Sequence, residues 1–382
     1  MVIATALLAV LVCGSLVYCV LMIVASWRYR KADLQTASRV GDMPPMSIVK
    51  PLCGYDEGLE ENIRSFMEQD YPCFEVIFGV HRYDDPAAGV AQRIIQEYAG
   101  RVKARLMVTG DSPIPNAKAF TLNRLVREAQ YELLVMSDSD IRVDRNLLRR
   151  LAAEFQERDA GLITCPYRAI AGKSVWSRLE AVGMNTELLG GVLVARMLEG
   201  MKFALGCTVA VRRSVLESMG GFAYLQDFLA EDFVIGQRAA ELGQVVLLSS
   251  YIIEHRIGSQ GAKRNLSHRL RWARSTRRSR PLGYWGQIFT YPLPWALLLW
   301  AFNSAAWPVV ALTLVLRSAA AVATAVYVLR DRKAGKELFL LPLQDLLGVI
   351  VWMGGFLGDT IVWRDRKCTV LRDGRLQVRP QA

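Results

Sequence analysis

The sequence lacks paired cysteines at the spacing of a metal site, and its seven cysteines are scattered along the chain. This pattern suggests neither a zinc site nor a disulfide framework, and it fits a reducing compartment. There is also no internal repeat and no low-complexity region. A chain of 382 residues has room for one sizeable globular domain plus membrane segments, but hardly for two independent soluble domains. We therefore expect a single core to carry the function.

Charge is absent from Val2 to Trp27, an apolar stretch that exceeds the roughly 20 residues needed to cross a bilayer. Arg28, Arg30 and Lys31 follow directly, which predicts that this flank faces the cytosol. A secretory signal would carry basic residues before its apolar core, and none is present here. The sequence thus predicts an uncleaved transmembrane anchor over residues 1–30.

Acidic residues are absent from Lys263 to Arg280, where eight residues are Lys or Arg. The formal charge of +11 is therefore concentrated rather than spread over the chain. A basic block beside a membrane entry suits anionic headgroups or a diphosphate. The block adjoins apolar segments and contains no recognised nucleic-acid motif, so nucleic acid is not an expected partner.

The hydrophobic residues, 52% of the chain, are concentrated in blocks. Phe289 to Leu329, broken near residues 303–308, is typical of two membrane crossings joined by a tight turn. A last apolar segment runs from about Leu338 to Val362. If it also crossed, the basic C-terminal tail would lie opposite the basic catalytic side, so we favour a re-entrant or interfacial segment. Arg317 and Asp345 form a possible intramembrane pair.

Between Met46 and about Ser250, short apolar runs alternate with amphipathic stretches, which predicts an α/β domain with a mostly parallel sheet covered by helices. The expected strands are Ser47–Leu52, Phe74–Val80, Ala104–Val108 and Glu132–Ser137. The expected helices are Glu57–Gln69, Pro86–Tyr98, Ala117–Glu128 and Val234–Leu242. In open α/β sheets ligands bind beyond the carboxyl ends of the strands, so polar clusters at these ends should converge on one crevice.

Two acidic clusters follow the second and fourth expected strands. Asp84 and Asp85 form one pair, and Asp138 and Asp140 flank Ser139 in a DxD pattern. Paired carboxylates supply the hard oxygen ligands that suit Mg²⁺ or Mn²⁺ bridging a diphosphate. The structural alternative is an ordinary turn or helix cap.

Two further clusters lie towards the C-terminus. Glu231 and Asp232 begin a helical stretch, where acids are also favoured simply by the helix dipole. His268, Arg271 and Trp272 have the spacing of one helix face, which presents a ring, a guanidinium and an indole together. A solvated basic helix at the membrane surface is the structural alternative.

In this order, the motifs resemble those of the inverting GT-A glycosyltransferases, most closely the ceramide glucosyltransferase family and its bacterial relatives that glycosylate hopanoid lipids. The resemblance covers nearly the whole chain. It rests on Val49-Lys50-Pro51-Leu52-Cys53-Gly54, Asp70-Tyr71-Pro72, Asp84-Asp85-Pro86-Ala87, Asp138-Ser139-Asp140-Ile141-Arg142-Val143, Gly206-Cys207-Thr208, Glu231-Asp232-Phe233, Arg271-Trp272 and Val362-Trp363-Arg364.

The resemblance implies a UDP-sugar donor, a lipid acceptor, a divalent cation and a role for each motif. Asp84 or Asp85 corresponds to the carboxylate that contacts uracil or its ribose, and Asn116 and Lys118 correspond to donor-binding residues. Asp138 and Asp140 correspond to the metal and diphosphate site, and Asp232 to the general base. Glu231, His268, Arg271 and Trp272 correspond to the residues that hold the diphosphate and the acceptor.

Two positions depart from the family pattern. The family generally has Gln or Arg where this chain has His268, and a neutral imidazole there can still form hydrogen bonds. Some ceramide-type relatives have Gly where this chain has Asp140, so the extra acid resembles the hopanoid-type and general bacterial versions more.

The chemistry of the residues supports the same interpretation. An alcohol is a poor nucleophile at neutral pH, so a carboxylate must take its proton, and we assign that role to Asp232. A cation on Asp140 and the guanidinium of Arg271 would stabilise the leaving diphosphate. A single displacement inverts the anomeric centre.

The predicted organisation is a transmembrane anchor over 1–30, a cytosolic GT-A domain over 40–284, membrane segments over 285–363 and a basic tail over 364–382. We expect a multi-pass protein of the bacterial inner membrane. The alternatives are a processive polysaccharide synthase, for which too few crossings are available, a membrane-bound nucleotidyltransferase and a non-catalytic membrane scaffold. The sequence does not identify the sugar or the lipid.

Overall fold

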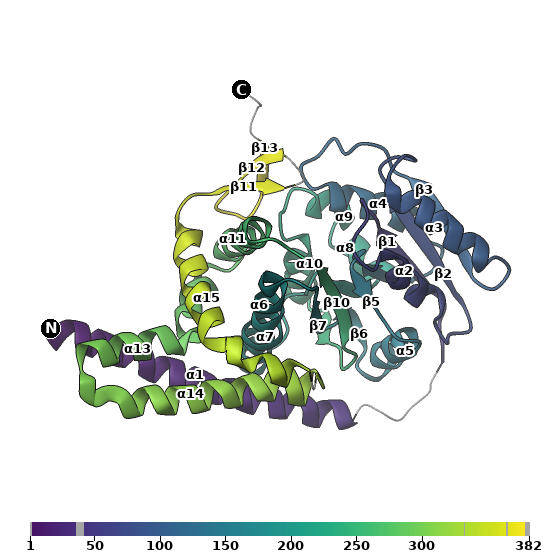
Figure 1. Cartoon of the computed structure of the whole chain (residues 1–382). Coiled ribbons are helices and arrows are strands. Elements are labelled where there is room, and N and C mark those ends of the chain that lie inside the picture. Colours follow the sequence, from purple (N-terminus) through teal and green to yellow (C-terminus); the bar gives the residue numbers. More distant parts are fainter. Residues whose placement is uncertain (1, 36–41, 332, 364–365, 379–382) are drawn as a thin grey trace. The chain divides into compact units, whose positions relative to one another are not determined.

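A computed structural model describes residues 2–35, 42–331, 333–363 and 366–378 (Figure 1). The chain forms two compact units, each assembled from separate stretches of sequence. The helical unit comprises Met1–Leu34, Arg168–Gly200 and Ser259–Asp373. The sheet unit comprises Gln35–Tyr167, Met201–Gly258 and Gly374–Ala382.

The sheet unit alternates strands and helices through most of its length. Its strands are β1 (Met46–Pro51), β2 (Phe74–Val80), β3 (Lys103–Val108), β4 (Leu133–Ser137), β5 (Ile141–Arg142), β6 (Ala160–Thr164), β8 (Thr208–Arg212), β9 (Val245–Leu248), β10 (Ile253–Gly258) and β13 (Leu376–Val378). Its helices are α2 (Leu59–Met67), α3 (Pro86–Glu97), α4 (Ala117–Glu128), α5 (Leu147–Glu157), α8 (Arg213–Ser218), α9 (Gly221–Leu225) and α10 (Glu231–Glu241). β7 (Tyr167–Ala171) starts at the end of a sheet-unit stretch.

Seven strands form the central sheet in the order β3-β2-β1-β4-β8-β6-β9. β3, β2, β1 and β4 are parallel, whereas β8 is antiparallel to both β4 and β6. The predicted mostly parallel α/β sheet is confirmed. β2 and α4 have the predicted bounds, and the other predicted strands begin within one residue of the expected position.

One core of the sheet unit packs α4, α9 and α10 against the central strands. Val49, Ile77 and Leu134 contribute from the strands, and Leu125 and Leu225 from the helices. β1 is buried along almost its whole length, as expected for a central strand covered on both faces. This core fixes the carboxyl end of β4 and the start of α10, which carry the acidic motifs.

The helical unit consists mainly of long apolar helices and their connections. Its helical elements are α1 (Val2–Gln35), α6 (Val175–Gly183), η1 (Met184–Leu188), α7 (Leu189–Glu199), α11 (Ala262–Ser279), α12 (Pro281–Gly286), η2 (Gln287–Thr290), α13 (Pro292–Phe302), η3 (Ser304–Ala306), α14 (Trp307–Ala321), η4 (Val322–Val328), η5 (Ala334–Leu340) and α15 (Leu341–Phe356). Two strands, β11 (Thr360–Trp363) and β12 (Arg366–Val370), pair antiparallel.

Four helical stretches within the described residues are long and apolar enough to cross a membrane: Val2–Ala32, Val175–Glu199, Ser304–Val328 and Ala334–Phe356. α1, α13 and α14 lie side by side (Figure 1) and share an apolar cluster that includes Val12, Ala296 and Leu299. The structure thus supports an apolar N-terminal helix and apolar helices near the C-terminus, as predicted.

Two details differ from the sequence prediction. α13 has only 11 residues, and a helix of that length spans about half of the ~30 Å hydrocarbon core. The segment expected to run to Val362 ends as a helix at Phe356, and residues 360–363 form a strand instead. Of the motif Val362-Trp363-Arg364, Arg364 lies outside the described residues.

The stretch Val175–Glu199 was not predicted as a membrane segment. It is continuous helix with a π-helical section, η1, in its middle. Charged residues such as Glu180 and Glu187 interrupt its apolar pattern, and their side chains face protein. These charges explain why the sequence analysis did not single out this segment.

The predicted pairing of Arg317 with Asp345 is confirmed. Arg317 donates to both carboxylate oxygens of Asp345, with Nη2 2.9 Å from Oδ1, and both side chains are almost completely buried. All seven cysteines are free thiols, which agrees with the absence of a disulfide framework. The predicted division of the chain into residues 1–30, 40–284, 285–363 and 364–382 stays a prediction.

Candidate active site

The turn after β4 carries the DxD pattern, and a buried lysine forms a hydrogen bond with its backbone. Lys50, near the end of the neighbouring parallel strand β1, is fully buried and donates a hydrogen bond to the backbone oxygen of Asp138. Its ammonium also lies 4.0 Å from the ring centroid of Phe66. Burial lowers the pKa of Lys50 to about 7, although Asp140 and Asp138 oppose this shift. Lys50 therefore fixes the backbone that positions both acids.

Asp140 is held by a histidine from another strand. Its Oδ2 lies 3.1 Å from Nε2 of His255, which β10 brings opposite Ile141 of β5. Burial disfavours the charged carboxylate, but attraction to His255, Lys50 and Lys118 outweighs it and lowers the pKa of Asp140. Asp140 is thus kept ionised.

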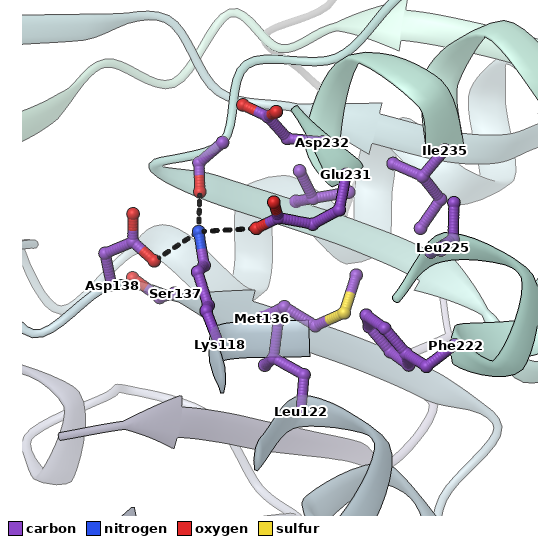
Figure 2. A pocket seen from close by; sticks show the side chains of 12 residues that line it. Lys118, Leu122, Met136, Ser137, Asp138, Phe222, Leu225, Glu231, Asp232 and Ile235 are labelled. Atoms are coloured by element: carbon purple, nitrogen blue, oxygen red, sulfur yellow. Dashed lines mark hydrogen bonds and ion pairs between the residues drawn. The ribbon is translucent and has the colours of Figure 1, made fainter. Parts of the chain in front are cut away.

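Lys118 connects the acidic clusters. Its Nζ lies 2.7 Å from Oδ1 of Asp138 and 3.3 Å from Oε1 of Glu231, and it donates to the backbone oxygen of Gly206 (Figure 2). Burial acts against its charge, but Asp138, Glu231 and Asp232 outweigh burial and raise the pKa of Lys118. This lysine remains an ammonium and partly neutralises three carboxylates.

Asn116 positions Glu231. Its side chain caps α4 by accepting a hydrogen bond from Ala119 N, and it donates to Oε2 of Glu231 over 2.9 Å. Asn116 is completely buried. It therefore contributes to the site through Glu231 rather than through an exposed surface of its own.

Asp232 is the second residue of α10 and remains half-buried. Burial, with a contribution from Glu231, raises the pKa of Asp232 to about 6 even though Lys118 lowers it. A Cβ atom on Gly206 would lie 2.2 Å from Oδ2 of Asp232. Only glycine at this position leaves room for the carboxylate.

Four of these side chains line one hollow of the sheet unit, whereas Lys50, Asn116, Asp140 and His255 do not line it. Its polar side carries Lys118, Asp138, Glu231 and Asp232, and its other side is apolar (Figure 2). The complete lining is Lys118, Leu122, Met136, Ser137, Asp138, Gly206, Val209, Phe222, Leu225, Glu231, Asp232 and Ile235. A carboxylate with a raised pKa beside a fixed ammonium suits proton removal next to a developing negative charge.

The predicted donor-binding pair Asp84 and Asp85 does not line this hollow. Asp85 caps α3 through Ala87 N and also accepts a hydrogen bond from Gly54 N over 2.9 Å. Asp84 is exposed and lies 3.2 Å from the guanidinium of Arg82. Asp85 thus ties the turn after β1 to the turn after β2, and a donor-binding role for either residue stays a prediction.

The predicted residues of α11 belong to the helical unit. Nδ1 of His268 lies 2.7 Å from Oε1 of the buried Glu180, and its ring centroid lies 4.9 Å from that of Trp272. His268 and Trp272 therefore share a helix face, as their spacing predicts. Roles for His268, Arg271 and Trp272 in binding the diphosphate or acceptor stay predictions.

Sequence reasoning did not single out Lys50 or His255 as site residues. Lys50 is a lone charge within an apolar strand, and His255 alternates with charged residues in β10. A lysine at a fully buried strand position is itself a signal, because such a charge needs partners.

Asp138 and Asp140 fit a divalent cation. Among the described residues, Asp140 Oδ1 is a buried carboxylate oxygen without a hydrogen-bond partner, which is the kind of atom a cation would satisfy. No cluster of three or more His, Cys, Asp or Glu in the described parts of the chain forms a metal site. The two aspartates would therefore share the cation with oxygens from outside the protein.

The mostly parallel sheet and its strand order place the sheet unit in the GT-A-like fold class. The chain belongs to glycosyl transferase family 21, whose family model matches residues 7–376.

Two curated relatives of this chain are ceramide glucosyltransferases of Caenorhabditis elegans. Ceramide glucosyltransferase 1 of Caenorhabditis elegans is 26% identical over 211 residues, covering 55% of this chain and 45% of that protein. Ceramide glucosyltransferase 3 of the same organism is 27% identical over 234 residues, covering 61% and 50%. The chain spans about half the length of these relatives.

A solved structure shows the same fold. The mannosyltransferase PcManGT from Pyrobaculum calidifontis, in complex with GDP-Man and Mn²⁺, superimposes with a TM-score of 0.52 at 17% identity. The match covers 91% of this chain and 99% of that one.

Proposed function

We propose that this protein transfers a sugar from a UDP-sugar to the hydroxyl group of a lipid, with inversion, and so forms a glycolipid. The observation that carries the proposal is the position of Asp232 in one hollow with Lys118 and Asp138, in a member of glycosyl transferase family 21. Catalysis of this transfer needs a base for the acceptor and positive charge for the leaving group.

Asp232 is the proposed general base. Its carboxylate is half-buried, and its pKa of about 6 lets it be deprotonated at neutral pH while still accepting a proton readily. It takes the proton of the acceptor hydroxyl as the oxygen forms a bond to the anomeric carbon. The bond between the anomeric carbon and the diphosphate breaks on the opposite face, so an α-linked donor yields a β-glycoside.

The leaving group is a nucleoside diphosphate whose negative charge must be stabilised. A divalent cation held by Asp138 and Asp140, Mg²⁺ or Mn²⁺, would supply this stabilisation when bound. The presence of Mn²⁺ in PcManGT supports a cation in this fold. Lys118 keeps Asp138 oriented, and we assign contacts with the diphosphate and acceptor to Glu231, His268, Arg271 and Trp272.

The acceptor is proposed to be ceramide-like or a hopanoid lipid. The names of the Caenorhabditis elegans relatives support a ceramide-like acceptor, and Asp140 matches the hopanoid-type pattern. Four apolar helical stretches are consistent with an integral membrane protein, for which we propose a cytosolic catalytic domain and the bacterial inner membrane.

The test is incubation of membranes containing the protein with radiolabelled UDP-sugars, followed by lipid extraction and mass analysis. We expect one labelled glycolipid carrying a single added sugar, together with released UDP. A long labelled polymer would instead indicate a polysaccharide synthase, and release of pyrophosphate would indicate a nucleotidyltransferase. No labelled lipid with any of the sugars would refute the proposal.

A further inference from the structure

The helical unit contains a hydrogen-bonded network of polar side chains that runs from α11 into the apolar helices. Arg269 of α11 donates through Nε to Oδ1 of Asn265 and through Nη1 to Oε1 of Gln344, 3.0 Å away. Gln344 of α15 donates to Glu187, 3.4 Å away, and the hydroxyl of Tyr291 donates to the other oxygen of Glu187 over 2.5 Å. These contacts link α11, α15, η1 and the start of α13.

Burying polar groups among apolar helices costs free energy, so a polar network in this place indicates a function. Glu187 lies in η1, the π-helical section of the candidate membrane span Val175–Glu199, and π-helical sections occur frequently at functional sites. Gln344 and Tyr291 are buried, whereas Glu187 and Arg269 keep part of their surface accessible. Glu187 and Arg269 are therefore the two members that keep some exposed surface.

Arg269 also has an unused donor. Its Nη2 is buried and has no hydrogen-bond partner among the described residues. Buried donors in native structures nearly always find an acceptor, so this atom calls for an oxygen that the protein itself does not supply. A hydroxyl or carbonyl oxygen of a ligand would satisfy it.

Among the four side chains Glu187, Arg269, Gln344 and Tyr291, the one negative and the one positive charge balance each other. Glu187 carries the negative charge and Arg269 the positive charge, with neutral Gln344 between them. A balanced pair offers no net attraction to a phosphate, but it offers both donors and acceptors to an uncharged head that carries hydroxyl and amide groups.

We propose that Glu187, Arg269, Gln344 and Tyr291 bind the uncharged polar head of the acceptor lipid. This inference rests on the proposed function for the identity of the ligand. A lipid held by its head among apolar helices keeps its hydrocarbon chains in an apolar environment. These four residues act in binding, and the proton transfer is still assigned to Asp232.

The test measures binding rather than turnover, so that its outcome is separate from that of the proposed function. The probe is a short-chain ceramide labelled with a nitrobenzoxadiazole fluorophore, and its Kd is measured in neutral detergent micelles by energy transfer from tryptophan. We expect Glu187→Ala and Arg269→Met to weaken binding of the probe by roughly tenfold or more, with UDP binding unchanged.

A matched control and a milder variant accompany these changes. Thr313→Val removes a hydroxyl that donates a hydrogen bond to the backbone oxygen of Val309 in its own helix, so the Kd of the probe should stay within about twofold. Tyr291→Phe deletes a single hydroxyl and should weaken binding several-fold without loss of folding, as checked by thermal melting.

An unchanged Kd in folded Glu187→Ala and Tyr291→Phe proteins would overturn the inference, as would a wild-type protein that does not bind the probe. A wild-type protein that binds the probe through these residues but transfers no sugar would support this site and contradict the proposed function.

Discussion

Individual charges determine what the hollow of the sheet unit can do. Lys118 lies between Asp138 and Glu231, and Asp232 lies on the same polar side. One ammonium cannot neutralise three carboxylates, so the site keeps an excess of negative charge that a cation can offset. Asp232 carries the raised pKa because it is buried beside another acid.

The pH dependence of transfer should follow Asp232. A base must be deprotonated to act, and the folded-state pKa of about 6 lies above the ordinary value for aspartate. Activity should therefore be full above neutral pH and fall as the pH drops through about 6. The charged groups that face Asp232 are Lys118, Asp138 and Glu231. A kcat profile measured between pH 4.5 and pH 8.5 checks this, and a rate that stays constant down to about pH 4.5 would count against the assignment.

Asp140 should control the metal requirement. We expect Asp140→Ala to raise the Mn²⁺ concentration needed for half-maximal activity by roughly tenfold or more, because one of the two proposed carboxylate ligands is lost. Titration of Mn²⁺ into chelator-treated protein measures this shift. If the chelator has no effect on the wild-type enzyme, the metal site is refuted.

At the residue scale, the acidic site residues could be predicted from the sequence, but Lys50 and His255, which contact them, could not. Asp138, Asp140, Glu231 and Asp232 stand out because they follow expected strands or begin an expected helix. Lys50 contacts Asp138 across 88 positions of sequence, and His255 contacts Asp140 across 115. Contacts over such separations depend on the strand order, which a single sequence does not reveal.

Among the elements, α10 determines where the proposed base lies. A Cβ atom on Gly236 would lie 2.3 Å from backbone atoms of Phe203 and Ala204, so the helix packs directly on the segment that leads to Gly206. The same segment leaves room for the Asp232 carboxylate. Close backbone packing in the middle of α10 therefore fixes the carboxylate of Asp232, the proposed base, at the start of the helix.

Gly236→Ala should destabilise the protein by about 1–3 kcal/mol, because neither helix nor backbone can move without loss of packing. Gly89→Ala is the matched control, since a Cβ there meets no atom within 4 Å and α3 has no strain at that position. The control should be neutral or gain about 0.5–1 kcal/mol from the lower entropy of the unfolded chain. Thermal melting of both variants measures the difference in stability, and equal melting temperatures would contradict the packing argument.

Elements with clear periodicity were predicted well, and elements with mixed character were not. Asn116 before Ala117 signals the cap of α4, and the structure begins the helix there. In Val175–Glu199, Glu180 and Glu187 hide a long apolar helix because each charge has its partner elsewhere in the helical unit. α13 is short because the chain breaks at Asn303, whose side chain accepts from Ala305 N.

At the scale of the whole molecule, each unit is assembled from separate stretches of sequence, so long-range contacts must hold each one together. In the helical unit, Arg317 of α14 and Asp345 of α15 form an ion pair with no more than 1% of either side chain exposed. Arg317 also reaches the hydroxyl of Thr186 in η1. Three helical segments therefore meet at this pair.

Arg317→Met should lower the free energy of unfolding by about 3–5 kcal/mol, because it leaves the Asp345 carboxylate buried and unpaired. The double replacement Arg317→Met with Asp345→Leu removes both charges and should recover most of this loss. Melting temperatures in detergent measure the difference. A double variant as unstable as the single one would show that the unpaired charge is not the cause.

The most direct test of the central claim compares donor binding with sugar transfer in Asp232→Asn. The amide keeps the size of the side chain but cannot accept the acceptor's proton, so the account predicts a UDP-sugar Kd close to that of the wild type and a transfer rate lower by roughly a hundredfold to ten-thousandfold. Transfer at the wild-type rate in this variant would contradict the assignment of Asp232 as the base and with it the proposed mechanism.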